Sequence, residues 1–176
     1  MDQLPPIPTE SSLLIETDRL ELRPILRDDA QLLFPVLSDP ALYEHTGDEP
    51  PASVSALREL YASREARRSP GGRELWLNWM IRIGASGEAI GYMQASVAPR
   101  RADLAWVIGS PWQSRGYASE AAKAVIDWLW AIGVTRIRAS INPHHAASRK
   151  VAINAGLRRT DEFSEGEEAW VLEAAR

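Results

Sequence analysis

Residues 109–121, GSPWQSRGYASEA, connect a strand-like run to a helical pattern and decide the fold. The preceding run RADLAWVI, residues 101–108, is apolar and of strand length, and apolar residues recur at helical spacing after the turn. A helix that begins after Gly116 presents unpaired backbone N–H groups and a partial positive charge, and glycine leaves room for a ligand to approach them. The segment therefore predicts a turn that can hold a phosphate, with Arg115 adding positive charge.

The turn differs from two common phosphate-binding sequences. No Gly-Lys-Ser/Thr follows Gly116, as a Walker loop requires, and the further glycines of a dinucleotide-binding fingerprint are missing. A Rossmann-type oxidoreductase is disfavoured because no G-x-G-x-x-G follows the first predicted strand. Taken alone, one glycine in such a turn is more often an ordinary helix entry than a ligand site.

Patterns on both sides of the turn predict an α/β (α+β) domain. The segment TDRLELR, residues 17–23, alternates leucines with charged residues, which is typical of a strand with one buried face, and Pro24 ends it. Further strands are expected at residues 76–83, 89–97, 101–108, 136–141, 158–163 and 169–173. Helices are expected at residues 28–39, 53–68, 117–133 and 147–155.

The composition is that of an ordinary globular protein of 176 residues, with 45% hydrophobic and 25% charged residues. The length predicts one domain, residues 13–176, after a proline-rich flexible arm, residues 1–12. The arm lacks a basic segment and an apolar run, and the most apolar stretch, residues 121–134, is too short and too charged to cross a bilayer. We therefore expect a cytoplasmic protein with no signal peptide and no membrane partner.

Charge and cysteine content exclude several kinds of function. The 24 acidic residues outnumber the 20 basic ones, and the formal net charge of -4 does not favour nucleic acid as a partner. The chain has no cysteine, which excludes disulfides, thiolate metal ligands and a cysteine nucleophile. His144 and His145 have no carboxylate or cysteine at ligand spacing, so no metal site is expected.

Residues 109–121 resemble the acetyl-CoA motif of the GNAT N-acetyltransferases, whose pattern Gln/Arg-x-x-Gly-x-Gly/Ala is met by Gln113, Gly116 and Ala118. The longer string is most similar to the RimJ/RimL-type branch. Three further pieces match that branch in order: TDRLELRP at 17–24, Ile90-Gly91 at the end of a hairpin, and residues 148–157, similar to its Asn-x-x-Ser helix. The resemblance spans about residues 13–173. It implies a GNAT-like single domain with a central, mixed, mostly antiparallel twisted sheet of six to seven strands and about four flanking helices.

The sequence departs from the branch pattern at three positions. His145 stands where the branch has an asparagine three residues before Ser148, Leu157 replaces a phenylalanine after Gly156, and Ser114 stands where many relatives carry glycine. The donors to a phosphate in this turn are backbone N–H groups, so the turn keeps its predicted role.

The resemblance implies an acyltransferase that uses acetyl-CoA as co-substrate and needs no metal. In the family, an amine attacks the thioester directly and no acyl-enzyme forms, which is compatible with a chain without cysteine. The acceptor would be a small-molecule amine or a protein N-terminus. A backbone N–H near Val107, on a strand that splays from its neighbour, would stabilise the developing oxyanion. The residues expected to bind acetyl-CoA are Val107, Gln113, Ser114, Arg115, Gly116, Tyr117, Ala118, His145, Ser148 and Arg149.

Two residues are candidates for proton transfer. Asp103, at a position where similar enzymes often carry glutamate, would take the proton of the amine; alternatively it is a solvated acid beside Arg100 and Arg101. Ser148 would donate to the departing thiolate, because no tyrosine lies at residues 147–155; alternatively it only bonds the local backbone.

Three residues are candidates for binding the acceptor. Glu44 and His45 lie in the loop that borders the acceptor pocket in the family, and Trp106 flanks the cofactor region. An exposed loop pair and a core tryptophan are the alternatives. Glu120, in the first turn of its helix, is better explained by the helix dipole than by catalysis. The alternative function is a catalytically silent CoA-binding or protein-interaction module on the same scaffold, and the sequence leaves a homodimer open.

Overall fold

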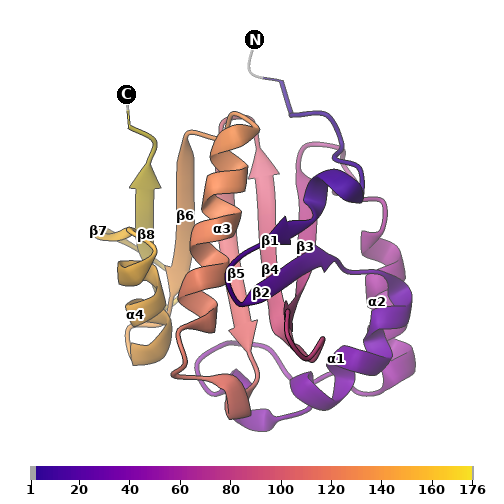
Figure 1. Ribbon diagram of the computed structural model, residues 1–176. Coiled ribbons are helices and arrows are strands. Elements are labelled where there is room, and N and C mark those ends of the chain that lie inside the picture. Colours follow the sequence, from indigo (N-terminus) through magenta and orange to yellow (C-terminus); the bar gives the residue numbers. More distant parts are fainter. Residues whose placement is uncertain (1–2, 176) are drawn as a thin grey trace.

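In the described part of the chain, eight strands form one sheet in the order β1-β2-β3-β4-β5-β6-β8-β7 (Figure 1). The computed structural model describes residues 3–175. The strands are β1 Ile15–Glu16, β2 Leu20–Pro24, β3 Leu75–Ile83, β4 Ala89–Ala98, β5 Arg101–Ile108, β6 Arg136–Ile141, β7 Arg158–Ser164 and β8 Glu167–Glu173. All neighbouring strands are antiparallel except β5 and β6, which are parallel. The predicted fold class and the mixed, mostly antiparallel sheet are therefore confirmed.

The sheet has more strands than the six to seven expected, because the chain forms β1. This strand has two residues and pairs with β2, with Ile15 opposite Leu22. The predicted strand at 17–23 begins later, at Leu20, since the Thr17 N–H donates to the Leu20 carbonyl at 2.9 Å and closes a turn between the two strands. Two residues are too few for an alternating pattern to show in a sequence.

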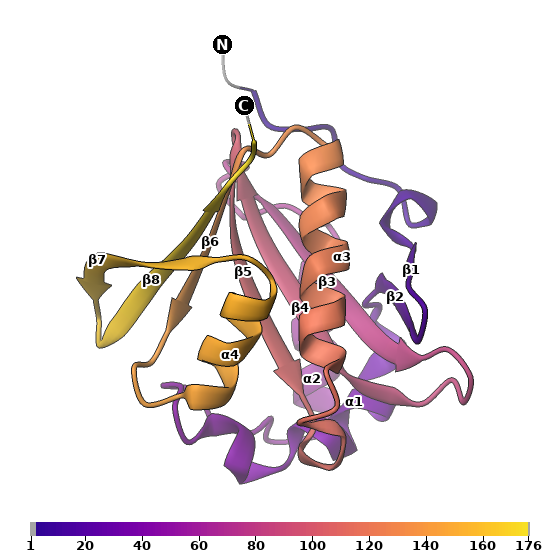
Figure 2. The same cartoon turned by 60° about the vertical axis from the view of Figure 1, so that its left-hand side comes forward.

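Four α-helices flank the sheet in the described part of the chain: α1 Ala30–Leu37, α2 Val54–Arg64, α3 Tyr117–Ala131 and α4 Ala146–Asn154. Figure 2 shows α3 and α4 on one face, with α1 and α2 behind the other. α3 buries an apolar stripe at helical spacing, Ala122, Val125, Ile126 and Leu129, against the sheet. None of the helices in residues 3–175 is long and apolar enough to cross a membrane.

α2 ends at Arg64, four residues before the end of its predicted range. The backbone of Arg67 takes a left-handed φ of 54°, and its carbonyl accepts a hydrogen bond from the Trp76 N–H at 3.0 Å. Arg68 then forms an isolated bridge with Leu75. These residues therefore already lead into β3 and cannot continue the helix.

Two indole groups attach the N-terminal segment to the sheet and to α3. Residues Ser11–Leu13 form a short 3₁₀-helix, and Leu13 is 1% exposed. Trp79 Nε1 donates to the Leu13 carbonyl at 2.8 Å, and Trp128 Nε1 donates to the Ser12 carbonyl at 2.7 Å. The end of the predicted arm, residues 1–12, is thus bonded to the core. The arm's flexibility stays a prediction, and residues 1–2 lie outside the described residues.

Candidate functional site

The parallel strands β5 and β6 separate after a short paired stretch, and their backbones diverge in a V (Figure 2). We call the region between the separated strands the opening. They pair only from Arg101 to Asp103 on β5. Beyond that point β5 stays paired with β4 as far as Ile108, and β6 stays paired with β8 as far as Ile141. Within residues 3–175, the edge of β5 from residue 104 to 108 therefore has no strand partner on the β6 side. Its backbone groups on that side are therefore not bonded to a strand, and one of them, the Ile108 carbonyl, accepts a hydrogen bond from Gln113 Nε2.

The predicted phosphate turn lies at the mouth of this opening, between β5 and α3. Residues 113–116 are exposed, and Gly116 has a left-handed φ of 81° directly before the helix. Ser114 is also left-handed, with a φ of 61°, which explains why glycine suits this position in relatives. Gln113 Nε2 donates to the Ile108 carbonyl at 2.9 Å. The Gln113 side chain therefore fixes the turn against the end of β5.

A clasp formed by the β1–β2 turn holds the start of α3. The Glu120 carboxylate accepts hydrogen bonds from Thr17 Oγ1 at 2.6 Å and from Arg19 Nε at 2.6 Å. Arg19 Nη1 also donates to the Arg115 carbonyl at 3.0 Å, and its guanidinium lies 4.6 Å from the centre of the Tyr117 ring. We call Thr17, Arg19 and Glu120 the α3 clasp. It gives Glu120 a structural role and ties the motif at 17–24 to the phosphate turn.

The register of β4 and β5 decides which N–H groups face the opening. Tyr92 lies opposite Val107, and the Gly109 N–H donates to the Ile90 carbonyl at 2.8 Å. Because hydrogen-bonding groups alternate sides along a strand, the Val107 N–H points to β4. The N–H groups that point into the opening are therefore those of its neighbours, residues 106 and 108.

The backbones of β4 and β5 approach each other closely at Gly91, which explains the glycine in the Ile90-Gly91 motif. A Cβ atom at Gly91 would lie 2.0 Å from the Val107 carbonyl oxygen and 3.0 Å from Ile108 Cα. No side chain fits there without moving β5. Gly91 therefore keeps β4 and β5 together at the level where β5 and β6 are apart.

The N-terminus of α4 forms the other side of the mouth. His145 is the N-cap, and its Nδ1 accepts a long hydrogen bond, 3.4 Å, from the Ser148 N–H. A neutral ring with this acceptor carries its proton on Nε2. Burial, and then the charge of His45, lower the pKa of His145. The structure therefore favours a neutral His145 in the place of the family's asparagine.

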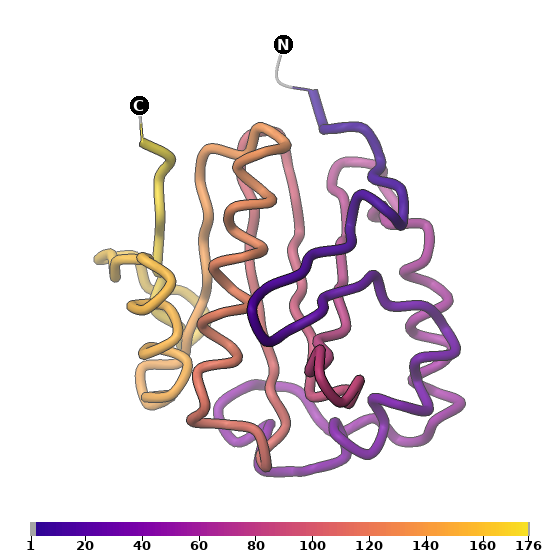
Figure 3. The backbone as a smooth tube through the Cα atoms, viewed as in Figure 1, coloured from indigo at the N-terminus to yellow at the C-terminus, as the bar shows by residue number. Residues whose placement is uncertain are grey.

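A loop from the first half of the chain reaches this helix. The His45 ring lies 4.8 Å from the His145 ring, centroid to centroid. Figure 3 shows the chain around residues 40–50 passing below the end of β5 and the start of α4. Ser110 Oγ donates to Asp39 Oδ2 at 2.5 Å and fixes the other end of the loop. The structure thus brings predicted acceptor and cofactor residues together, while Glu44 is exposed.

Arg149 is occupied by neighbours other than the turn. Its Nε lies 3.6 Å from Glu168 Oε2, its Nη1 donates to the Pro143 carbonyl at 3.3 Å, and its guanidinium lies 5.9 Å from the centre of the Trp170 ring. Both Glu168 and Trp170 belong to β8. A contact between Arg149 and a nucleotide phosphate would have to compete with these interactions.

Asp103 lies at the closed end of the opening. Its Oδ1 is 3.6 Å from Arg138 Nη1, and its side chain is 51% exposed. Four residues along a strand span about 13 Å, so Asp103 would reach a group beside Val107 only through a chain of several water molecules. Trp106 is half-buried and packs in the core under α3 and α4, whereas Val107 packs in the core under α1 and α2. The two neighbours therefore face opposite sides of the sheet.

A family model described as an acetyltransferase (GNAT) domain matches residues 19–158. The chain belongs to the GNAT acetyltransferase family. It is 26% identical over 155 residues to the uncharacterized N-acetyltransferase YoaA of Bacillus subtilis (strain 168), and the alignment covers 83% of each protein.

Two solved structures share the GNAT fold with this chain. One is a putative ribosomal-protein-serine acetyltransferase from Vibrio cholerae, with a TM-score of 0.73 and 18% identity over 92% of this chain and 97% of that one. The other is the aminoglycoside acetyltransferase AAC(6')-Ib in complex with ribostamycin and coenzyme A, with a TM-score of 0.74 and 20% identity over 89% of this chain and 94% of that one. The predicted GNAT-like fold is therefore confirmed.

A cluster of tyrosines in this GNAT domain gave no signal in the sequence. Tyr61, which is 4% exposed, and the half-buried Tyr92 pack in one core with Val107, and the Tyr43 hydroxyl donates to the Leu37 carbonyl at 2.8 Å. Burial raises the pKa of Tyr61, and it raises that of Tyr92 to about 12. The Tyr61 hydroxyl has no hydrogen-bond partner in residues 3–175. These residues come from three separate segments, so only folding brings them together.

No group of three histidine, cysteine, aspartate or glutamate residues within residues 3–175 is placed to hold a metal ion. The α3 clasp was missed for the same reason as the tyrosines. Arg19 lies in a matched motif, but its partner Glu120 follows 101 residues later. The only local signal was the acidic residue in the first turn of the helix.

Proposed function

We propose that this GNAT protein transfers an acetyl group from acetyl-CoA to a primary amine, either a protein N-terminus or a small molecule, by direct attack in a ternary complex. The observation that carries the proposal is the opening between β5 and β6 with the start of α3 at its mouth. The related proteins are acetyltransferases by name, which supports the same chemistry. Membership of the RimJ/RimL-like branch and a cytoplasmic location belong to the proposal as well.

The start of α3 fits the pyrophosphate of coenzyme A. The first intrahelical hydrogen bond runs from the Glu120 N–H to the Gly116 carbonyl, so the N–H groups of residues 117–119 have no partner inside the helix. The preceding turn, residues 113–116, is exposed, and Gly116 has no side chain beside these N–H groups. Arg115 is exposed in the turn and adds a positive charge, whereas the charge of Arg19 is paired with Glu120.

The free edge of β5 fits the thioester end. The amine nitrogen attacks the thioester carbonyl, the C–S bond breaks, and negative charge develops on the carbonyl oxygen in between. A backbone N–H in the opening can stabilise that charge, and we assign this role to residue 106 or 108, because the register directs their N–H groups away from β4. The Val107 side chain itself packs in the core under α1 and α2.

Two protons have to move in this reaction. The amine must lose one, and we assign its acceptance to Asp103 through a chain of several water molecules, with Arg138 beside the carboxylate at 3.6 Å. The departing thiolate must gain one, and we assign this to the Ser148 hydroxyl at the start of α4. His45 and His145 hold the acceptor loop against that helix.

Calorimetric titration with acetyl-CoA, followed by a panel of amines, tests the proposal. We expect Gly116→Asp to abolish acetyl-CoA binding, because it places a side chain and a negative charge at the pyrophosphate. Gly133→Asp is the matched control, since Gly133 is also left-handed, with a φ of 91°, and lies at the far end of α3 with nothing within 4 Å of an added Cβ. It carries the same backbone strain but should leave acetyl-CoA affinity unchanged.

The outcomes separate the two functions under consideration. Binding and turnover of at least one amine support the transferase. Binding without turnover of any amine supports the silent CoA-binding module instead. Equal acetyl-CoA affinity of Gly116→Asp and wild type would show that the turn is not the pyrophosphate site.

A further inference from the structure

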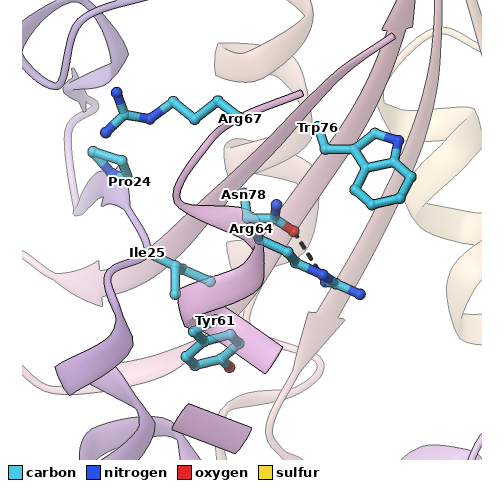
Figure 4. A pocket seen from close by; sticks show the side chains of 7 residues that line it. All are labelled: Pro24, Ile25, Tyr61, Arg64, Arg67, Trp76 and Asn78. Carbon is cyan, nitrogen blue, oxygen red and sulfur yellow. Dashed lines mark hydrogen bonds between the residues drawn. The ribbon is translucent and has the colours of Figure 1, made fainter. Parts of the chain in front are cut away.

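Arg64, the last residue of α2, extends over the sheet without meeting a carboxylate. Its Nη1 lies 3.3 Å from Asn78 Oδ1 on β3, as Figure 4 shows. The same Nη1 lies 3.3 Å from Gln94 Oε1 on β4. Both partners are neutral amides at the long end of hydrogen-bond distances. Within residues 3–175, no carboxylate oxygen lies within 4.0 Å of this guanidinium.

The arginines around Arg64 differ from it in this respect. Arg23, also half-buried on the same part of the sheet, forms a salt bridge with the buried Asp29 at 2.5 Å. Arg67, three residues after Arg64, has Glu10 at 3.5 Å. A half-buried guanidinium loses part of its hydration, and amide oxygens compensate this less well than a carboxylate does. Arg64 therefore has unused capacity to bind an anion.

The position of Arg64 relates it to the reaction site. Gln94, which Arg64 contacts, lies opposite Ala105 on β5, and Tyr92 lies opposite Val107. Gln94 and Val107 are therefore diagonal neighbours on the same face of the sheet. Diagonal neighbours of this kind are about 7–8 Å apart. Ala105 is exposed, so this part of the face is not covered by other residues.

Charge of the opposite sign lies on the same face of the sheet. Asp103 precedes Ala105 by two residues on β5, so its side chain is on the face that carries Gln94, and it is 51% exposed. An acceptor with a positive amine and a negative group is complementary to this arrangement.

We propose that Arg64 binds a carboxylate of the acceptor, so that the substrate is an amine that also carries a carboxylate, such as an amino acid. This inference rests on the proposed function. A fully cationic amine would instead place positive charge beside Arg64. Asn78 and Gln94 hold the guanidinium in place through their amide oxygens until the carboxylate binds.

The first test compares amino acids with their amides, which have the same shape but no carboxylate. We expect kcat/KM for L-alanine, L-leucine or L-phenylalanine to exceed that for the corresponding amide by about 10- to 100-fold, the effect of one charged hydrogen-bonded pair. Arg64→Gln should abolish this preference, and Arg64→Lys should retain part of it. The matched control is Arg58→Gln, because Arg58 lies on the same helix, is 55% exposed and pairs with Asp28 at 2.8 Å.

A second test does not need turnover. Protein saturated with coenzyme A is titrated with N-acetyl-L-leucine, which is the product form with its carboxylate, and with N-acetyl-L-leucinamide. We expect only the acid to bind to wild type and to Arg58→Gln, and neither compound to bind to Arg64→Gln. Melting temperatures of the three proteins show whether each is folded.

The two tests distinguish this inference from the proposed function. If the acid binds through Arg64 but no amine is acetylated, the carboxylate site stands and the transferase fails. If amines are acetylated but acids and amides react equally, or if the preference survives in Arg64→Gln, the carboxylate site is wrong. In the second test, the carboxylate site is wrong if wild type binds N-acetyl-L-leucine no better than N-acetyl-L-leucinamide.

Discussion

Removing the Glu120 side chain should loosen the α3 clasp and, with it, the phosphate turn. Besides the two bonds from side chains, the Glu120 carboxylate accepts the backbone N–H of Arg19 at 3.1 Å, and its side chain is only 19% exposed. Glu120→Ala leaves all these donors without their acceptor. The change therefore tests whether the β1–β2 turn stabilises the start of α3.

The expected loss follows from the exposure of the partners. A hydrogen bond to a charged group contributes about 1.5–3 kcal/mol when its loss leaves the donor unsatisfied. Arg19 is 47% exposed, so water replaces part of what it loses and the ion pair counts for little by itself. We therefore expect Glu120→Ala to lower the free energy of unfolding by about 2 kcal/mol, the lower part of the range for such a change. In a domain of this size that lowers Tm by about 4–8 °C.

The loss should depend on pH with a defined sign. Burial raises the pKa of Glu120, but the hydrogen bonds from Thr17 and Arg19 and the charge of Arg19 outweigh it and hold the pKa below its ordinary value. A carboxylate with a lowered pKa stabilises the folded state fully above its unfolded pKa of about 4.3 and loses this contribution as pH falls through the folded pKa. The difference between wild type and Glu120→Ala should therefore shrink in acid.

Urea unfolding at pH 7 and pH 3.5, with calorimetric acetyl-CoA titration, measures both effects. Affinity should fall because Arg19 also holds the Arg115 carbonyl. Glu173→Ala is the control, since Glu173 is 57% exposed and pairs with Arg136 at 2.7 Å, and such a pair contributes about 0.2–1 kcal/mol. A loss for Glu120→Ala no larger than that of the control, with unchanged acetyl-CoA affinity, would refute the reasoning.

Three further substitutions test separate parts of the site. Asp103→Asn should lower turnover by about 10² and move the acidic limb of the pH–rate profile if Asp103 is the general base, and an intact profile would return it to a structural role. Ser114→Gly should raise the free energy of unfolding by about 0.5–1 kcal/mol in urea unfolding, because it relieves a left-handed φ of 61° at the cost of a freer unfolded chain; a lower stability would contradict this. Burial and the charge of His45 lower the pKa of His145 in the folded protein. The contribution of His145 to the free energy of unfolding should therefore be full above the ordinary histidine pKa of about 6.5, and it should be lost as pH falls through the lowered pKa of the folded state. His145→Asn should accordingly be less sensitive than wild type to a change from pH 7.5 to pH 5, and equal sensitivity would show that the His145 proton does not matter to folding.

Most elements could be predicted from local patterns, and the exceptions have physical causes. β6 was predicted with its observed bounds, because Ile137, Ala139 and Ile141 alternate with polar residues and are buried on one face. β1 has too few residues to show any alternation. The predicted range of α2 was too long. The Arg67 carbonyl bonds the Trp76 N–H at the start of β3, and a helical sequence pattern gives no sign of this tertiary contact.

The site was predicted unevenly for a related reason. The turn from Gln113 to Ala118 could be located because its backbone N–H groups are contiguous in the chain. Gly116 also marks a position where the backbone takes a left-handed conformation. The direction of the Val107 N–H could not be predicted, because it depends on the register between β4 and β5. Arg64 gave no signal at all, since an arginine at the end of an exposed helix is ordinary until its neighbours on the sheet are known.

By itself, the sequence determined the fold class, the turn at the start of α3 and the exclusion of cysteine chemistry. These depend on periodicity, on the conformational freedom of Gly116 and on composition, all of which are local or additive properties. Only the tertiary structure decided that β5 and β6 separate, that the α3 clasp fixes the turn, and that Arg64 faces the sheet without a carboxylate. Each of these is a contact, or the lack of one, between residues far apart in the chain, and its energy depends on burial and distance that no local pattern encodes.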